Sequence, residues 1–317
     1  MSSLRILQLS DTHLRGDHGP NAEGVDPEAT FTAALDALAD IGEIDLIVLG
    51  GDLSDDGSPA SYQRLRELVT GFAGRHGADG STAPVAWVPG NHDRRPGFRA
   101  VLGPGLSEQP APPSGEDQRP VYDCRTVNGF RVVTLDSSVP GRTHGLVDEE
   151  QLGWLAGVLG TDACAGTLIV VHHPPVAPVT PLHRGIGLLN TDRLVRLLAH
   201  SDVCLVLSGH YHHELVDSIP GRNGRIPVVV SAGIVNHNQV LAPPGQERAT
   251  AASGAMLIEI DADPASRGAG SARGAHVRVI PLALGPEAEL SRLDPEQVAA
   301  VARRIDASPE ERRAAQR

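Results

Sequence analysis

Short aliphatic runs alternate with longer amphipathic stretches along the N-terminal third of the chain. The runs end in polar residues and predict buried strands at 4–10, 44–49 and 84–88. One helix is predicted from Asp26-Pro27 to about Asp40, because Asp favours the N-cap and Pro the first turn. A second helix begins in the same way at Ser58-Pro59. This β-α-β-α-β order predicts parallel strands whose carboxyl ends meet at one edge of a sheet.

The rest of the chain continues the alternation and then becomes rich in strands. Its predicted elements are a loop at 103–120, a hairpin at 121–136 that turns at Asn128-Gly129, a helix at 148–159, a strand at 168–171, a Pro-rich loop at 174–189, a helix at 191–200 and a strand at 203–207. Further strands are predicted at 214–219, 226–231, 255–260 and 276–282, with a hairpin loop at 266–274. Two helix starts in the tail, Asp294-Pro295 and Ser308-Pro309, predict a helical appendage at 285–317 after a main domain at 1–284.

Several of the apolar runs end in His, Asp or Asn. The segments are Asp11-Thr12-His13, Gly50-Gly51-Asp52, Gly90-Asn91-His92-Asp93, His172-His173 and Gly209-His210-Tyr211-His212. Loops that follow strands are where rigid scaffolds present reactive groups, although any one of these segments could be ordinary turn chemistry. Five of them in order indicate one metal centre assembled from across the chain.

The residue types suit a centre with two metal ions. Asp52 can bridge two cations with its two carboxylate oxygens, and the pairs Asp11/His13 and His210/His212 have the i, i+2 spacing that places side chains on one face of a strand. Imidazole and carboxylate ligands without a thiolate favour Mn, Fe, Co or Zn over a structural zinc site. Two such ions ~3.5–4 Å apart would clamp a phosphoryl group and lower the pKa of a bridging water.

Some neighbouring residues leave alternatives open. Two adjacent imidazoles on a strand point to opposite faces, so His172 is the preferred ligand and His173 the alternative. Asp93 is expected to orient a nearby histidine or arginine. Arg94 and Arg95 could contact a substrate phosphate or belong to a solvated loop.

Composition narrows the class of protein. With 317 residues, 40% hydrophobic and 21% charged, the chain reads as a soluble globular protein, and its net charge of −12 argues against a nucleic-acid polymer as partner. All of its 27 basic residues are arginine. The three cysteines lie in or beside apolar runs and are predicted to be buried, reduced thiols. No run approaches the ~20 apolar residues of a membrane span, and no signal peptide precedes the first strand, so the cytoplasm is expected.

The ordered set of motifs resembles the calcineurin-like metallophosphoesterase superfamily from Asp11 to His212. Closer features are similar to the class III cyclic nucleotide phosphodiesterases of mycobacterial type: the segments 51–57 (GDLSDDG), 135–141 (LDSSVPG), 151–155 (QLGWL) and 172–175 (HHPP). The resemblance implies an α/β fold, a four-layer α/β/β/α sandwich of two mixed β-sheets flanked by helices, in place of a simple doubly wound sheet. Residues 1–284 would form the metallophosphoesterase domain.

The resemblance also implies roles for individual residues. One metal would bind Asp11, His13, Asp52 and His212, and the second would bind Asp52, Asn91, His172 and His210. His92 would face the phosphate as the catalytic residue, either stabilising the transition state or protonating the leaving oxygen. Together with the position of Arg94 directly after this motif, this predicts substrate contacts at Asn91, His92 and Arg94.

The implied activity is that of a metal-dependent phosphodiesterase with Mn and/or Fe, or else Zn or Co. It would hydrolyse a small phosphodiester, first of all cAMP to the nucleoside 5′-monophosphate, by in-line attack of a metal-bridging hydroxide. The alternatives are another diester such as a 2′,3′-cyclic nucleotide or glycerophosphodiester, a phosphomonoester, or a non-catalytic scaffold with this fold. The resemblance further implies a homodimer.

Overall fold

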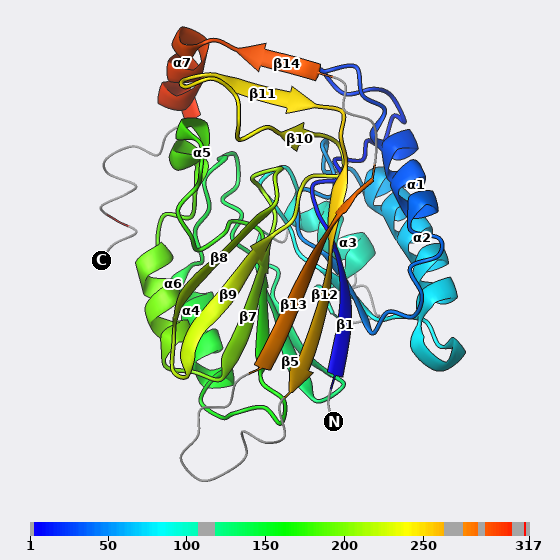
Figure 1. Ribbon diagram of the computed structural model, residues 1–317, viewed down its shortest axis with the longest axis vertical. Helices are drawn as coiled ribbons and strands as arrows, with labels where there is room; N and C mark the ends of the chain where they lie inside the picture. Colours follow the sequence, from blue (N-terminus) through cyan, green and yellow to red (C-terminus); the bar gives the residue numbers. More distant parts are fainter. Residues whose placement is uncertain (1–2, 107–117, 263–274, 285–288, 306–313, 315–317) are drawn as a thin grey trace.

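The computed structural model describes residues 3–106, 118–262, 275–284, 289–305 and 314, and two mixed sheets form its centre (Figure 1). The first sheet has the order β13-β12-β1-β2-β3 and comprises β1 (Ser3–Leu9), β2 (Leu46–Leu49), β3 (Val85–Trp87), β12 (Gly254–Ala262) and β13 (Ala275–Ala283). The first three strands of the chain are parallel, as predicted, and β12 pairs antiparallel with both β1 and β13.

The second sheet has the order β4-β5-β6-β7-β9-β8. Its strands are β4 (Asp123–Val127), β5 (Phe130–Leu135), β6 (Thr167–Val171), β7 (Val203–Ser208), β8 (Leu215–Gly221) and β9 (Gly224–Val230). The inner strands β5, β6, β7 and β9 are parallel, and β4 and β8 pair antiparallel at the edges.

Helices cover the outer face of each sheet (Figure 1). They are α1 (Pro27–Ala37), α2 (Pro59–His76) and α3 (Arg95–Leu102) on the first sheet, with the short 3-10 helix η1 (Ala78–Gly80), and α4 (Glu149–Val158) and α6 (Thr191–Ala199) on the second. The predicted caps are present, because the side chains of Asp26 and Ser58 accept from the backbone N–H groups of Ala29 and Ser61.

Successive side chains of β1 point to opposite faces of the first sheet, and this explains how the layers of the fold pack. Ile6 belongs to a buried cluster between the sheets that includes Phe130 of β5, whereas Leu7 belongs to a cluster that includes Phe31 of α1. A third buried cluster packs the outer face of the second sheet against α4 and α6, for example through Leu155. The four-layer α/β/β/α sandwich of two mixed sheets is therefore confirmed.

A third, small sheet was not predicted. It has the order β10-β11-β14, with β10 (His237–Asn238), β11 (Glu247–Thr250) and β14 (Glu289–Leu293). Figure 1 shows it lying across the end of the two large sheets at which β1 finishes, beside α5 (Pro181–Ile186) and α7 (Pro295–Ile305).

Several predicted element boundaries need correction. The stretch 285–317 is not only helical, because β14 precedes the helix α7, which starts directly after Asp294 as predicted. α5 lies in the stretch predicted as a Pro-rich loop, and α3 was not predicted. The helix start at Ser308, most of the loop predicted at 103–120 and all of the loop predicted at 266–274 lie outside the described residues. Within the described part of the chain, no helix is long and apolar enough to cross a membrane.

The cysteines differ in part from the prediction. None of the three takes part in a disulfide. Cys124 and Cys204 are partly buried, but Cys164 is exposed because it lies in the turn that precedes β6. Burial raises the pKa of the Cys204 thiol to about 12, so this group is inert near neutral pH.

Candidate metal centre

The predicted ligands converge on the carboxyl ends of strands from both sheets. Asp11 and Asp52 follow β1 and β2, Asn91 follows β3, His172 follows β6, and His210 follows β7. Because these strands are parallel within each sheet, their following loops lie at the same end of the sandwich.

An unusual backbone conformation is shared by many of these residues. Positive φ angles are found at Asp11 (56°), His13 (48°), Asp52 (49°), His210 (74°) and His212 (52°). Non-glycine residues rarely adopt this left-handed region, and each such residue costs of order 1–3 kcal/mol that the surrounding structure must offset. The strand alternation invoked for the two i, i+2 pairs was wrong, because β1 ends at Leu9 and β7 at Ser208. Left-handed turns beyond the strand ends orient these side chains instead.

The first ligand cluster consists of Asp11, His13, Asp52 and His212. One potential ligand atom from each of these residues lies within 4.8 Å of the others. Asp11 Oδ1 is 3.3 Å from His212 Nε2, and His13 Nε2 is 3.8 Å from Asp52 Oδ2.

The second ligand cluster consists of Asp52, His172 and His210, within the same 4.8 Å limit. Asp52 Oδ2 lies 3.4 Å from His172 Nε2. Asp52 thus belongs to both clusters, which is the geometry required of a bridging carboxylate. Asn91 lines the same cavity as Asp52 and His210.

The donor atoms fit a metal because several of them are buried without a hydrogen-bond partner among the described residues. These atoms are His13 Nε2, Asn91 Oδ1 and His172 Nε2. Leaving a buried polar atom unpaired costs about 1–3 kcal/mol, so a ligand is expected to satisfy them.

The opposite ring nitrogens of the histidines are held by the protein. His172 Nδ1 lies 2.8 Å from the carbonyl oxygen of Gly50, and His210 Nε2 lies 2.9 Å from that of Ile186. His212 Nδ1 bonds to the side-chain oxygen of Asn236. Such contacts fix the tautomer and ring orientation of metal-binding histidines.

Electrostatics in the metal-free site favour the metal-binding protonation state at Asp52 and His210 but not at His172. Burial would lower the pKa of His172, but Asp52 and Asp11 raise it to about 9. Burial alone would raise the pKa of Asp52, but His172, His92 and His13 outweigh it and hold this pKa well below its usual range. Burial, together with His173 and His172, lowers the pKa of His210 well below its usual value. A charged carboxylate and a neutral imidazole are the forms that bind metal ions.

His92 lies on the rim of the site. Its side chain is 40% exposed, and its Nδ1 is 3.1 Å from Asp55 Oδ1. Its backbone N–H donates a 2.8 Å hydrogen bond to Asp52 Oδ1, so the ring is anchored beside both clusters. Burial would lower the pKa of His92, but Asp52 and Asp55 raise it to about 9 in the metal-free site.

The other residues near the site have structural partners. His173 Nδ1 lies 2.8 Å from the Ser137 hydroxyl and its Nε2 lies 3.1 Å from the Thr143 carbonyl, so both nitrogens are engaged. Of the two adjacent histidines, only His172 points an unpartnered nitrogen at Asp52.

Neither arginine contacts the cavity. Arg94 is exposed, absent from the cavity lining, and its aliphatic stem lies over Gly57. Arg95 instead forms a 2.8 Å ion pair with the buried Asp136.

Asp93 does not orient a histidine or arginine as predicted. Its carboxylate accepts hydrogen bonds from the backbone N–H groups of Leu53, Ser54 and Gly90 and from the hydroxyl of Tyr62. It therefore fastens the loop after β3 to the loop after β2.

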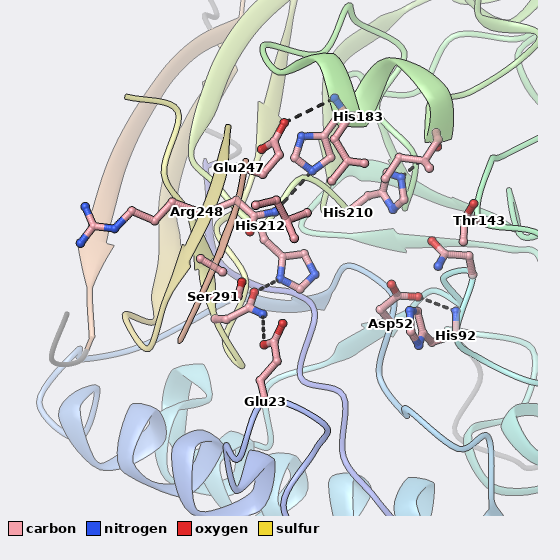
Figure 2. Close-up of a pocket in the computed structure, with 17 residues that line it drawn as sticks. Glu23, Asp52, His92, Thr143, His183, His210, His212, Glu247, Arg248 and Ser291 are labelled. Atoms are coloured by element: carbon pink, nitrogen blue, oxygen red, sulfur yellow. Dashed lines mark hydrogen bonds between the residues drawn. The ribbon is translucent and has the colours of Figure 1, made fainter. Parts of the chain in front are cut away.

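A cavity of about 290 Å³ opens from the metal-ligand clusters (Figure 2). Asp52, Asn91, His92, His210 and His212 form its metal-side wall. The opposite wall comes from β11, β14 and α5, and comprises Leu182, His183, Ile186, Glu247, Arg248, Ala249, Ser291 and Leu293. The strands β11 and β14 of this wall were not predicted, because neither contains an aliphatic run.

Comparison with known proteins places this geometry in a family. The family model described as calcineurin-like phosphoesterase matches residues 4–214. A cAMP/cGMP dual specificity phosphodiesterase of Mycobacterium tuberculosis is 36% identical over 260 residues, covering 81% of this chain and 76% of that protein. The 3′,5′-cyclic adenosine monophosphate phosphodiesterase CpdA of Escherichia coli K12 is 34% identical over 215 residues, covering 67% of this chain and 70% of CpdA.

Solved structures show the same fold at low sequence identity. The purple acid phosphatase PPD1 from yellow lupin is 14% identical with a TM-score of 0.53, covering 87% of this chain and 53% of that one. GAP50, the anchor in the inner membrane complex of Plasmodium, is 12% identical with a TM-score of 0.50, covering 98% and 99% of the two chains. These two structures support the fold alone, whereas the match of the family model and the sequence relatives decide membership: the chain belongs to the calcineurin-like phosphoesterase family.

Proposed function

We propose that this protein is a binuclear metal-dependent phosphodiesterase that hydrolyses 3′,5′-cyclic nucleotides, first of all cAMP, to nucleoside 5′-monophosphates. The observation that carries the proposal is the pair of ligand clusters that share Asp52 and open on one cavity. Two sequence relatives named as cyclic nucleotide phosphodiesterases support the substrate class.

We infer the metal ligands from these two clusters. The first metal would bind Asp11, His13, Asp52 and His212, and the second would bind Asp52, Asn91, His172 and His210. Mixed imidazole, carboxylate and amide donors suit Mn and/or Fe, with Zn or Co as alternatives. When bound, such a pair supplies positive charge to the phosphoryl oxygens and makes a water molecule more acidic.

His92 is assigned the catalytic role. Asp55 holds its Nδ1, so Nε2 is the nitrogen available to a substrate in the cavity that His92 lines. From the rim it would donate a hydrogen bond or proton to the departing ribose oxygen. Asn91 lies beside it and would contact the phosphate, whereas the position of Arg94 gives no support for a direct substrate contact.

The test is a substrate panel with Mn-loaded protein. We expect cAMP and cGMP to be cleaved faster than 2′,3′-cAMP, glycerophosphodiesters and p-nitrophenyl phosphate. His92→Ala should lower kcat for cAMP by about 10²–10⁴-fold with its metal content unchanged. Asp52→Ala should lose bound metal as well as activity, because both clusters depend on it.

The substrate panel also distinguishes the proposed function from its alternatives. Faster cleavage of another diester or of a monoester would change the substrate class and keep the metal centre. Natively folded protein that binds no metal and cleaves nothing would instead indicate a scaffold, because a fold does not by itself determine function.

The proposal also covers the partners, the location and the oligomeric state of the protein. A net charge of −12 disfavours a nucleic-acid polymer as substrate, so the partner is a small phosphodiester. We place the protein in the cytoplasm and expect a homodimer. Light scattering coupled to size-exclusion chromatography would measure its mass against the 33.2 kDa of one chain.

A further inference from the structure

Glu247 is a buried acidic residue in the cavity wall opposite the metal-ligand clusters. It lies on β11 and is only 7% exposed. Figure 2 shows it beside His183, on the other side of the cavity from Asp52 and His92. The match to the family model ends at residue 214, so Glu247 lies in a part of the chain that the family model does not cover.

The protein supplies few hydrogen bonds to this carboxylate. The backbone N–H of Leu182 donates to Glu247 Oε1 at 3.4 Å, which is long for a hydrogen bond. The nearby Thr180 hydroxyl is shared with His183 Nδ1, 2.7 Å away. Burial raises the pKa of Glu247, and Thr180 and Leu182 offset this only in part. A carboxylate has about four acceptor sites, so Glu247 has capacity for further donors.

The position of Glu247 indicates which part of a substrate would reach it. A phosphate would be repelled by the carboxylate and belongs at the opposite wall, beside Asp52 and His92. The cavity of about 290 Å³ is at the small end of ligand sites, so one small ligand would span both walls. Its non-phosphate end would then face Glu247 and its polar neighbours His183 and Asn238.

We propose that Glu247 is a specificity-determining residue that accepts hydrogen bonds from the nucleoside part of the cyclic nucleotide. The donor is either the ribose 2′-hydroxyl or an N–H group of the base. Selection arises because a substrate without the donor leaves the buried carboxylate with one hydrogen bond fewer. This assignment rests on the proposed function, since it requires a cyclic nucleotide as substrate.

The test compares substrates that carry and lack the donor. Glu247→Ala and the size-matched Glu247→Gln would be assayed on cAMP, 2′-deoxy-cAMP, purine riboside 3′,5′-cyclic phosphate and bis(p-nitrophenyl) phosphate. For Glu247→Ala we expect kcat/KM on cAMP to fall about 10–100-fold, mostly through KM, and at least tenfold more than on bis(p-nitrophenyl) phosphate. Glu296→Gln removes an equal charge from the exposed face of α7 and should match the wild type.

The two cyclic nucleotide analogues identify the donor. The analogue that lacks it should be cleaved equally well by wild type and Glu247→Ala, because the interaction is already missing. If both variants retain wild-type kcat/KM on cAMP, or lose it equally on bis(p-nitrophenyl) phosphate, Glu247 only supports α5 and the assignment is overturned. Wild-type protein that cleaves bis(p-nitrophenyl) phosphate but no cyclic nucleotide would overturn the proposed function as well.

Discussion

The phenolic hydroxyl of Tyr62 donates a 2.9 Å hydrogen bond to the buried carboxylate of Asp93. Tyr62 also accepts a 2.9 Å hydrogen bond from the backbone N–H of Arg94. Helix α2 therefore holds, through one fully buried side chain, the loop that carries Asn91 and His92. This contact stabilises the site, and its contribution can be tested without changing any proposed metal ligand.

Tyr62→Phe should lower the free energy of unfolding by about 1–3 kcal/mol, because the buried carboxylate of Asp93 loses a donor. Urea denaturation of the metal-free protein measures this change. Tyr122→Phe is the matched control, since the Tyr122 hydroxyl makes an exposed 3.1 Å contact with Glu150 and its loss should cost about 0.5 kcal/mol or less. Equal effects of the two substitutions would show that Tyr62 does not support the loop through Asp93.

Asn236 should control how tightly metal is bound, although it is not in either ligand cluster. Its side-chain oxygen accepts from His212 Nδ1, and its amide donates a 3.1 Å hydrogen bond to Glu23. Asn236→Ala should weaken metal affinity about 10–100-fold, measured by competition with a chelator, because His212 loses its orienting partner. Asn236→Asp keeps the acceptor and should bind more tightly than the alanine variant. An alanine variant with wild-type affinity would rule out this role.

Gly51 should not tolerate a side chain. Its φ is +103°, and a Cβ atom there would lie 2.3 Å from Nδ1 of the buried His172. Gly51→Ala is therefore expected to cost about 2 kcal/mol or more in stability and to reduce bound metal. Gly153→Ala in α4 provides the contrast, since open space surrounds that position and alanine should stabilise the helix by about 0.5–1 kcal/mol. Calorimetry and metal analysis of both variants would check the pair.

The lowered pKa of Asp56 predicts that the stability of the protein depends on pH. Burial alone would raise its pKa, but hydrogen bonds from Ser58 and Gly16 outweigh this and lower the pKa to about 2, from 3.8 for an unperturbed Asp. A lowered pKa in the folded state means stabilisation that is complete above about pH 4 and lost as the pH falls toward 2. Asp56→Asn should thus cost about 1 kcal/mol at pH 7, after allowance for solvent screening, and much less at pH 2.5.

Chemical denaturation of the metal-free wild type and Asp56→Asn at both pH values would measure the two differences. A difference that stays constant between pH 7 and pH 2.5 would contradict the assignment. The hydrogen bond from Gly16 would then not depend on the charge of Asp56.

The loops that carry the two candidate ligand clusters could be predicted because their signals are local. Each consists of an aliphatic run followed within three residues by Asp, Asn or His, as at Asp52 and Asn91, and this pattern can be recognised without knowledge of the fold. The reason given for the spacing of Asp11 and His13 was wrong, because left-handed backbone angles cannot be read from such a pattern. These angles are maintained by contacts with distant loops, such as that between the N–H of His13 and the carbonyl of Asp52.

The strands β11 and β14 in the second wall of the cavity could not be predicted for a different reason. They pair with each other, but their sequences ERAT and ELSRL contain no aliphatic run. Their association depends on tertiary packing rather than on local preference. The helix α3 was not predicted for a similar reason, because the sequence Arg94-Arg95-Pro96 is compatible with both a loop and a helix start.

The pairing of β1 with β12 has a consequence for synthesis of the protein in the cell. Residues near the N-terminus complete their hydrogen bonds only with Met256 to Asp261, so the first sheet remains open until most of the chain has left the ribosome. Until then β1 has an unsatisfied edge, which is a site for mispairing with other nascent chains. Chaperone demand should therefore persist late into translation, and a ribosome stalled before β12 should carry a protease-sensitive polypeptide that cannot retain metal.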